Sequence, residues 1–192
     1  GLIGYPLSHS FSQQYFSRKF AEEKIDARYL LFPIPAITDF NQLLDHHPYI
    51  AGLNVTIPYK EQIIPYLDEL DDTAREVGAV NVIKVLWNGK KPFLKGYNSD
   101  VYGFEQSLLP LLEQYHQRAL ILGTGGASKA VAFVLKKLKI PYSFVSRTPK
   151  QSNEIAYSDL TKETIHTHAI IINTSPIGMF PYPDNCPDIP YE

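Results

Sequence analysis

The chain has 192 residues, of which 44% are hydrophobic and 20% are charged, and its formal net charge is −2. This composition is typical of a globular chain with one large or two smaller domains, and the near-neutral charge argues against a nucleic-acid partner. No apolar run approaches the ~20 residues that a membrane span needs. A single cysteine, Cys186, excludes an intramolecular disulfide, so we expect a cytoplasmic protein without a membrane partner.

The first half of the chain alternates strand-like apolar runs with amphipathic runs of helical spacing. This alternation is typical of α/β proteins with a mainly parallel sheet. Strands are expected over residues 2–5, 27–34 and 50–57, and helices over residues 12–24, 37–47 and 58–70.

The pattern changes after residue 78. Two strand-like runs, 79–87 and 91–98, flank the turn signal Asn88-Gly89 and predict an antiparallel hairpin. Alternation then resumes, with helices expected over 100–115 and 127–139 and strands over 118–123, 142–147 and 169–173. We predict one domain over 1–99 and a second over 100–192, and we expect both to belong to a longer chain that continues beyond the second domain.

The most informative stretch is "LILGTGGASKA", which places Gly123, Gly125 and Gly126 between an apolar strand and an Ala-rich helix. In a βαβ unit, such glycines permit a tight turn and let the backbone approach a pyrophosphate at the helix N-terminus. The third fingerprint position is Ser128 rather than glycine. The alternative is a glycine-rich turn that serves packing alone, but the strand–turn–helix context favours a nucleotide site.

The end of the next strand indicates which nucleotide binds. NAD sites usually carry an acid there for the ribose 2′-hydroxyl, whereas this strand ends in "SRTPK", with Arg147 lying 21 residues after Gly126. A guanidinium can form paired, charge-assisted bonds with a 2′-phosphate. The sequence therefore favours NADP over NAD, with a basic loop that binds nothing as the alternative.

A third loop, "INTSPIGM", leaves the strand expected over 169–173. Loops at strand C-termini line the ligand crevice of doubly wound sheets. Thr174 to Met179 are therefore expected to border the nicotinamide, or to form a simple turn.

If the second domain binds a nicotinamide cofactor, the first should supply a proton relay, because hydride transfer to a carbonyl leaves an alkoxide that must be protonated. Lys60 is a candidate, since Pro58 suits a first helical position and puts this lysine in the first turn. A helix N-terminus and partial burial would both lower the pKa of such a lysine. Asp100 is a candidate partner for the ammonium, although an aspartate at a helix start is also an ordinary N-cap.

Several polar residues at strand ends add to a possible substrate pocket. Ser8 and Ser10 follow the first strand, and one serine of "SHSFS" is expected to cap the next helix. Thr56 and Asn54 alternate along one strand and therefore share a face. Asn81 lies in an apolar run, where a buried amide needs a partner. The histidines have no spacing that completes a metal site, so no metal is expected.

These stretches together resemble the shikimate dehydrogenase family. The resemblance runs nearly end to end and rests on the following motifs: "GYPLSHSFS", "GLNVTIPYKE", "GAVNVI", "GYNSDVYGF", "LGTGGASKA", "SRT" and "NTSPIGM". It implies an N-terminal α/β substrate domain, a Rossmann-type doubly wound NADP domain, and interconversion of 3-dehydroshikimate and shikimate in the route to chorismate and aromatic amino acids. A monomer or a homodimer fits the resemblance.

The resemblance also implies roles for individual residues. Lys60 and Asp100 would form the catalytic pair. The substrate would contact Ser8 and Ser10 through its carboxylate, and its hydroxyls would contact Thr56, Asn81 and Asp100. The cofactor NADP(H) would contact the glycine turn and the basic loop, at Gly123, Thr124, Gly125, Gly126, Ala127, Ser146, Arg147 and Thr148. Lys150 beside this loop, and Thr174 and Met179 from the position of their own loop, complete the expected cofactor contacts.

Two departures from the family pattern qualify these roles. The family often has a second arginine where this chain has Gln151, with Lys150 beside it as a possible substitute. A glutamine and a tyrosine that the family supplies from a C-terminal segment are not identifiable in this sequence. An NAD-preferring quinate/shikimate dehydrogenase and a non-catalytic NADP-binding sensor are the alternatives.

Overall fold

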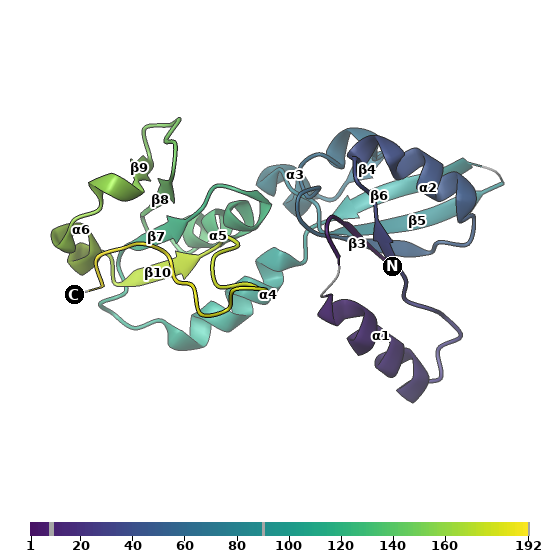
Figure 1. The fold of residues 1–192 in the computed structure, drawn as a ribbon, viewed down its shortest axis with the longest axis horizontal. Coiled ribbons are helices and arrows are strands. Elements are labelled where there is room, and N and C mark those ends of the chain that lie inside the picture. Colours follow the sequence, from purple (N-terminus) through teal and green to yellow (C-terminus); the bar gives the residue numbers. More distant parts are fainter. Residues whose placement is uncertain (8–9, 90, 192) are drawn as a thin grey trace. The chain divides into compact units, whose positions relative to one another are not determined.

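The structure is a computed structural model that describes residues 1–7, 10–89 and 91–191. Its contacts divide the chain into two compact units, Gly1–Ser99 and Asp100–Glu192. Each unit has its own sheet (Figure 1). This mixed α/β architecture confirms the fold class expected from the alternation of helical and strand patterns.

The sheet of the first unit has six strands in the order β2-β1-β3-β5-β6-β4. Strands β1, β2 and β3 run parallel to one another, and the hairpin of β5 and β6 continues the sheet antiparallel to β3. The bounds are β1 Leu2–Gly4, β2 Leu31–Pro33, β3 Gly52–Val55, β4 Glu69–Leu70, β5 Val82–Asn88 and β6 Lys91–Tyr97.

Side-chain alternation along the strands gives this sheet two apolar faces. Ile3 and Val55 belong to the main core with Phe40 of helix α2 (Phe40–His46), which Figure 1 shows against the sheet. Leu2 points to the opposite face, where it packs with Tyr29 and with the aromatic residues of helix α1 (Phe11–Glu22). Helix α3 (Asp72–Val77) begins at an Asp71 cap and ends at Gly78.

The second unit has an all-parallel sheet in the order β10-β7-β8-β9. Its strands are β7 Ala119–Leu122, β8 Tyr142–Ser146, β9 Glu154–Ala156 and β10 Ile170–Asn173. Its helices are α4 Asp100–Leu108, α5 Gly126–Lys137 and α6 Lys162–Thr167. Reading from β9 to β10 gives the strand order 3-2-1-4 of a Rossmann half, in which the strand order, and not the strand direction, reverses between β7 and β10.

One predicted element is wrong. No helix spans residues 58–70; the segment contains turns, a 3₁₀ turn at Ile64–Tyr66 and the short strand β4. The carbonyl of Lys60, which a helix would offer to residue 64, accepts instead from the Val80 N–H at 2.7 Å. Pro65 has no N–H to extend a helix, and burial of Tyr59 and Ile63 in the core holds the irregular path.

Phe40→Ala tests the core of the first unit. The Phe40 side chain is fully buried, so truncation should cost about 3–5 kcal/mol, from lost apolar burial and from the cavity that remains. Trp87, the sole tryptophan, lies in this unit and reports its unfolding by fluorescence in a denaturant titration. Tyr49→Ala, at a side chain that is 95% exposed, is the control and should change stability by less than about 0.5 kcal/mol. Equal effects of the two substitutions would contradict this account of the core.

Candidate active site and nucleotide site

The polar residues of the first unit gather where β3 ends. Thr56 follows β3 directly, and its N–H donates to the Ile3 carbonyl of β1 at 2.9 Å. A Cβ on Gly4 would lie 2.4 Å from the Thr56 methyl carbon, so only glycine permits this approach of the two strand ends. Thr56 is thereby held at the carboxyl edge of two neighbouring parallel strands, where α/β proteins usually bind ligands.

Lys60 lies beside this edge in a loop that tertiary contacts fix. The side chain of Tyr59 is 2% exposed, and its hydroxyl donates to the Ile34 carbonyl at 2.7 Å. Burial raises the pKa of Tyr59, so this phenol stays neutral at pH 7 and serves as an anchor. Lys60 itself is half-buried, and because no helix begins at Pro58, the expected effect of a helix dipole on Lys60 does not apply.

Asn81 is the buried amide that the sequence singled out, and it lies next to both of these segments. The backbone carbonyl of Asn81 accepts from the Val55 N–H at 2.9 Å, and the N–H of the preceding residue, Val80, donates to the Lys60 backbone carbonyl. The Asn81 side chain is bonded to Ser99: its Oδ1 accepts from the Ser99 N–H at 2.8 Å, and its Nδ2 donates to the Ser99 Oγ at 2.9 Å. Thr56, Lys60 and Asn81 are therefore brought together by backbone hydrogen bonds.

The other residues predicted to bind substrate are placed less fully. Ser10 precedes α1 at the N-cap position, but its side chain makes no capping bond. Ser8 lies outside the described residues. Asp100 is half-buried and opens α4 in the second unit, directly after Ser99. Its pairing with Lys60 stays a prediction.

In the second unit, the glycine turn joins β7 to α5. Gly123 has φ +110°, and a Cβ there would meet the Thr174 Oγ1 at 3.0 Å, so glycine is required for both reasons. A Cβ on Gly125, by contrast, would meet no atom within 4 Å. The backbone at Gly125 therefore faces open space at the N-terminus of a 12-residue helix whose first turn contains no acidic residue, which suits an anionic group. Thr124 and Ala127 are exposed beside it, and Gly126 is partly buried.

Ser128 has a structural role within this turn. It is 1% exposed, and its Oγ donates to the Gly125 carbonyl at 2.6 Å. The serine at the third fingerprint position is therefore accommodated inside the helix.

The basic loop begins where β8 ends. Ser146 accepts from the Thr148 N–H at 3.2 Å, and both Arg147 and Lys150 are exposed. Burial raises the pKa of Tyr157, and the positive charge of Arg147 opposes that rise. The loop ends at Glu154, the first residue of β9 and an acid that the sequence analysis did not consider, whose carboxylate accepts from the Lys150 N–H at 2.8 Å. This bond holds the loop closed from its far end.

The third loop lies against the glycine turn. The Thr174 hydroxyl donates to the Leu122 carbonyl at 2.8 Å, which ties the end of β10 to the end of β7 at the switch in strand order. Asn173 shapes the loop, since its Oδ1 accepts from the Ser175 N–H and its Nδ2 donates to the Ile177 carbonyl. Met179 lies further along and is 56% exposed. The sequence analysis did not single out Asn173, which the "NTS" pattern typical of an Asx turn would have indicated.

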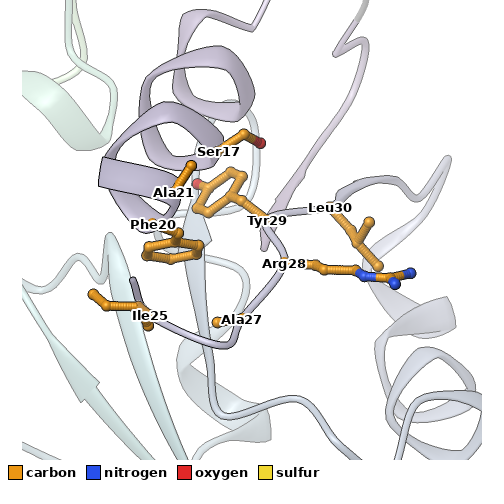
Figure 2. A pocket seen from close by; sticks show the side chains of 8 residues that line it. All are labelled: Ser17, Phe20, Ala21, Ile25, Ala27, Arg28, Tyr29 and Leu30. Atoms are coloured by element: carbon orange, nitrogen blue, oxygen red, sulfur yellow. The ribbon is translucent and has the colours of Figure 1, made fainter. Parts of the chain in front are cut away.

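A cavity of about 360 Å³ lies elsewhere in the first unit, between α1 and residues 25–30 (Figure 2). Figure 2 shows the rings of Phe20 and Tyr29 along its wall, with the guanidinium of Arg28 extending away from them. None of the predicted site residues lines it. Its wall is the apolar packing of α1, and it is not the candidate site.

Residues 1–7, 10–89 and 91–191 offer neither a metal-binding cluster nor a membrane-spanning helix. They contain no cluster of three or more His, Cys, Asp or Glu side chains arranged to hold a metal ion. No helix in this part of the chain has the length and apolar character to cross a bilayer.

Known proteins resemble this chain over most of its length. A family model described as the shikimate dehydrogenase substrate binding domain matches residues 2–83. A protein of Methanosphaera stadtmanae named shikimate dehydrogenase (NADP(+)) is 36% identical, over 98% of this chain and 71% of its own.

Solved structures agree with this similarity. A shikimate dehydrogenase from Aquifex aeolicus matches with a TM-score of 0.80 at 31% identity, over 100% of this chain and 73% of its own. Shikimate 5-dehydrogenase from Thermus thermophilus, solved in complex with NADP(H) and shikimate, also gives 0.80, at 25% identity over 98% of this chain and 72% of its own.

The two glycines of the turn should respond differently to alanine. Gly123→Ala introduces a strained positive φ and a close contact with Thr174, and should destabilise the second unit by about 1–3 kcal/mol. Gly125→Ala meets open space in the protein and should cost less than about 1 kcal/mol, yet its methyl group should weaken NADP binding at the helix N-terminus by at least about tenfold. Thermal unfolding and calorimetric titration with NADP measure the two effects. Unchanged affinity in Gly125→Ala would exclude a nucleotide at this turn.

Proposed function

Because the chain belongs to the shikimate dehydrogenase family, we propose that it catalyses the NADPH-dependent reduction of 3-dehydroshikimate to shikimate and the reverse oxidation. The chain is an oxidoreductase of the NADP-dependent shikimate dehydrogenase type. The direction of the reaction and the use of 3-dehydroshikimate are the proposed parts. The observation that carries the proposal is that one chain combines a dinucleotide-type glycine turn with a polar cluster at a second sheet edge.

The first unit supplies the proposed substrate site. Thr56 and Asn81 offer hydroxyl and amide groups to the ring hydroxyls of the substrate, and Asp100 adds a carboxylate from the start of α4. Ser8 and Ser10 are assigned to the substrate carboxylate. Support for Ser10 comes from its N-cap position, where the hydroxyl is not used for capping.

Lys60 is the proposed acid–base group. NADPH, when bound, supplies a hydride to the carbonyl carbon of the substrate. The Lys60 ammonium donates the proton that completes the alcohol, and in the oxidation its neutral amine accepts that proton. Asp100 is assigned to hold the ammonium in place. The neighbouring Tyr59 is not a competing acid, because its hydroxyl is committed to the Ile34 carbonyl and its pKa is raised by burial.

The second unit supplies the proposed cofactor site. The N–H groups at Gly125, Gly126 and Ala127 begin α5 and would hold the pyrophosphate. Ser146, Arg147, Thr148 and Lys150 would meet the 2′-phosphate of the adenosine. The loop from Thr174 to Met179 lies beside the glycine turn through the Thr174 bond to Leu122 and would border the nicotinamide.

Lys60→Ala tests the proton relay. Loss of acid–base assistance should lower kcat for shikimate oxidation by about 10²–10⁴, with a smaller change in KM. The measurement is absorbance of the reduced nicotinamide at steady state. Lys19→Ala removes an exposed lysine paired with Glu23 on α1 and is the control. Turnover in Lys60→Ala equal to that of the unsubstituted protein would remove the assigned role. Cofactor binding without any oxidation by the unsubstituted protein would instead favour a sensor.

Arg147→Ala tests the basis for NADP. Loss of a charged bond to the 2′-phosphate should raise KM for NADP by about 10- to 100-fold, while KM for NAD, which has no such phosphate, should change less than about threefold. Lys162→Ala removes an exposed cation from the same unit, at the start of α6, and serves as the control. A preference of the unsubstituted protein for NAD would refute the use of Arg147 and favour the quinate/shikimate alternative.

A further inference from the structure

We propose that Ser99 is a positioning residue for the reaction, held by the Asn81 carboxamide so that Asp100, the next residue, is fixed in place. This inference rests on the proposed function, because it presumes the catalytic role proposed for Asp100. The roles that the family resemblance implies for Asn81 and Asp100 are ligand roles and do not include Ser99.

The ladder of hydrogen bonds between β5 and β6 stops two residues before Ser99. The last paired residues of β5 and β6 are Val82 and Tyr97. One further backbone bond follows, from the Asn81 N–H to the Tyr97 carbonyl at 3.0 Å. Beyond this bond, the segments before β5 and after β6 have no further strand-to-strand hydrogen bonds, so other groups must hold them together.

Two asparagine side chains continue the connection where the ladder ends. Asn98, 6% exposed, donates from its Nδ2 to the Ala79 carbonyl at 2.9 Å. Asn81, 8% exposed, reaches the other way and engages both the N–H and the Oγ of Ser99. The two amides therefore cross-link residues 79–81 to residues 98–99 in both directions.

The orientation of the Asn81 amide is fixed by its partners. A backbone N–H can only donate, so the atom 2.8 Å from the Ser99 nitrogen must be the amide oxygen. The Nδ2 then faces the Ser99 Oγ, which accepts its proton. The same Oγ also lies 3.3 Å from the Asn81 Oδ1, so the oxygen and the nitrogen of the amide both contact Ser99.

The dipeptide Val80-Asn81 also holds the Lys60 segment. Val80 donates its N–H to the Lys60 carbonyl, and Asn81 holds Ser99, so adjacent residues fix both segments. Asp100 is joined to Ser99 by a single peptide bond, which sets their Cα separation at about 3.8 Å. Displacement of a catalytic group by about 1 Å can lower a rate 10²-fold. Fixing Ser99 therefore aids the reaction by limiting displacement of the Asp100 backbone.

A double-mutant cycle tests this inference. Ser99→Ala removes the acceptor of the Nδ2 bond and keeps the backbone bond. We expect kcat for shikimate oxidation to fall about tenfold while KM for shikimate changes less than threefold. Ser99→Thr, which restores a hydroxyl, should return kcat to within about twofold. In an Asp100→Asn background, Ser99→Ala should have less than a twofold effect, because Ser99 acts through Asp100.

Two further measurements separate the possible failures. Ser107→Ala, which removes an exposed serine of α4 bonded to the Gly103 carbonyl, should leave kcat unchanged. Amide hydrogen exchange over residues 97–103 should accelerate in Ser99→Ala while the thermal midpoint stays near that of the unsubstituted protein.

The outcomes are distinct. A large rise in KM, or equal effects of Ser99→Ala with and without Asp100, would overturn the inference and make Ser99 a substrate ligand or a structural residue. A Ser99→Ala protein with normal kcat, or with unchanged exchange, would also overturn it, while leaving the proposed function intact. Absence of shikimate oxidation in the unsubstituted protein would overturn the proposed function and this inference together.

Discussion

The first unit depends on the hydrogen bonds at Val80 and Asn81, where the parallel strands meet the antiparallel hairpin. Asn81 accepts from Val55 at the end of β3 and donates to Tyr97 at the end of β6, and Val80 donates to Lys60. Strand β3 thus joins two parts of the sheet that run in different directions. Buried backbone groups that lose a ladder must find other partners, and here those partners come from the loops that carry the candidate chemistry. The position of Lys60 therefore follows from the need of the Val80 N–H for a hydrogen-bond acceptor beyond the end of the sheet.

The second unit solves a comparable problem with glycine. At the change of strand order, the end of β10 comes so close to the end of β7 that a Cβ on Gly123 would crowd Thr174. The hydroxyl of Thr174 donates a hydrogen bond to the Leu122 carbonyl, while Gly125 faces open space. The contact between loops and the open helix N-terminus are thus two results of one turn. In both units, the polar groups lie just beyond strand ends, where a rigid sheet holds them while their outer surfaces remain accessible.

The sequence predicted the elements with strong periodicity and missed those that depend on tertiary contacts. The runs around β1, α1, β3, the hairpin, β7, α5, β8 and β10 were all found, because their apolar spacing is clear over several residues. Helix α3, helix α6 and strand β9 were missed, since the two helices are single short segments that begin at side-chain caps and β9 is held by its pairing with β8. The helix expected over 58–70 was wrong for the related reason that Val80, distant in sequence, takes the Lys60 carbonyl. Predictions for individual site residues rested on motifs, and Ser99 and Glu154 went unnoticed because their partners, Asn81 and the Lys150 N–H, become neighbours only in the folded chain.

The wrong helix also changes the physical account of Lys60. A lysine in the first turn of a helix would sit against the positive end of the dipole, at a cost of about 0.3–1 kcal/mol. No such cost arises here, because the loop has no aligned row of helical N–H groups beneath the side chain. The loop is held from below by Tyr59 and Ile63 in the core and from the side by Val80. The loop is thus held by the burial of two neighbouring side chains and by one backbone hydrogen bond, and these interactions do not involve the Lys60 ammonium. A change in the protonation of Lys60 therefore leaves these contacts of its loop in place, which is what an acid–base residue requires.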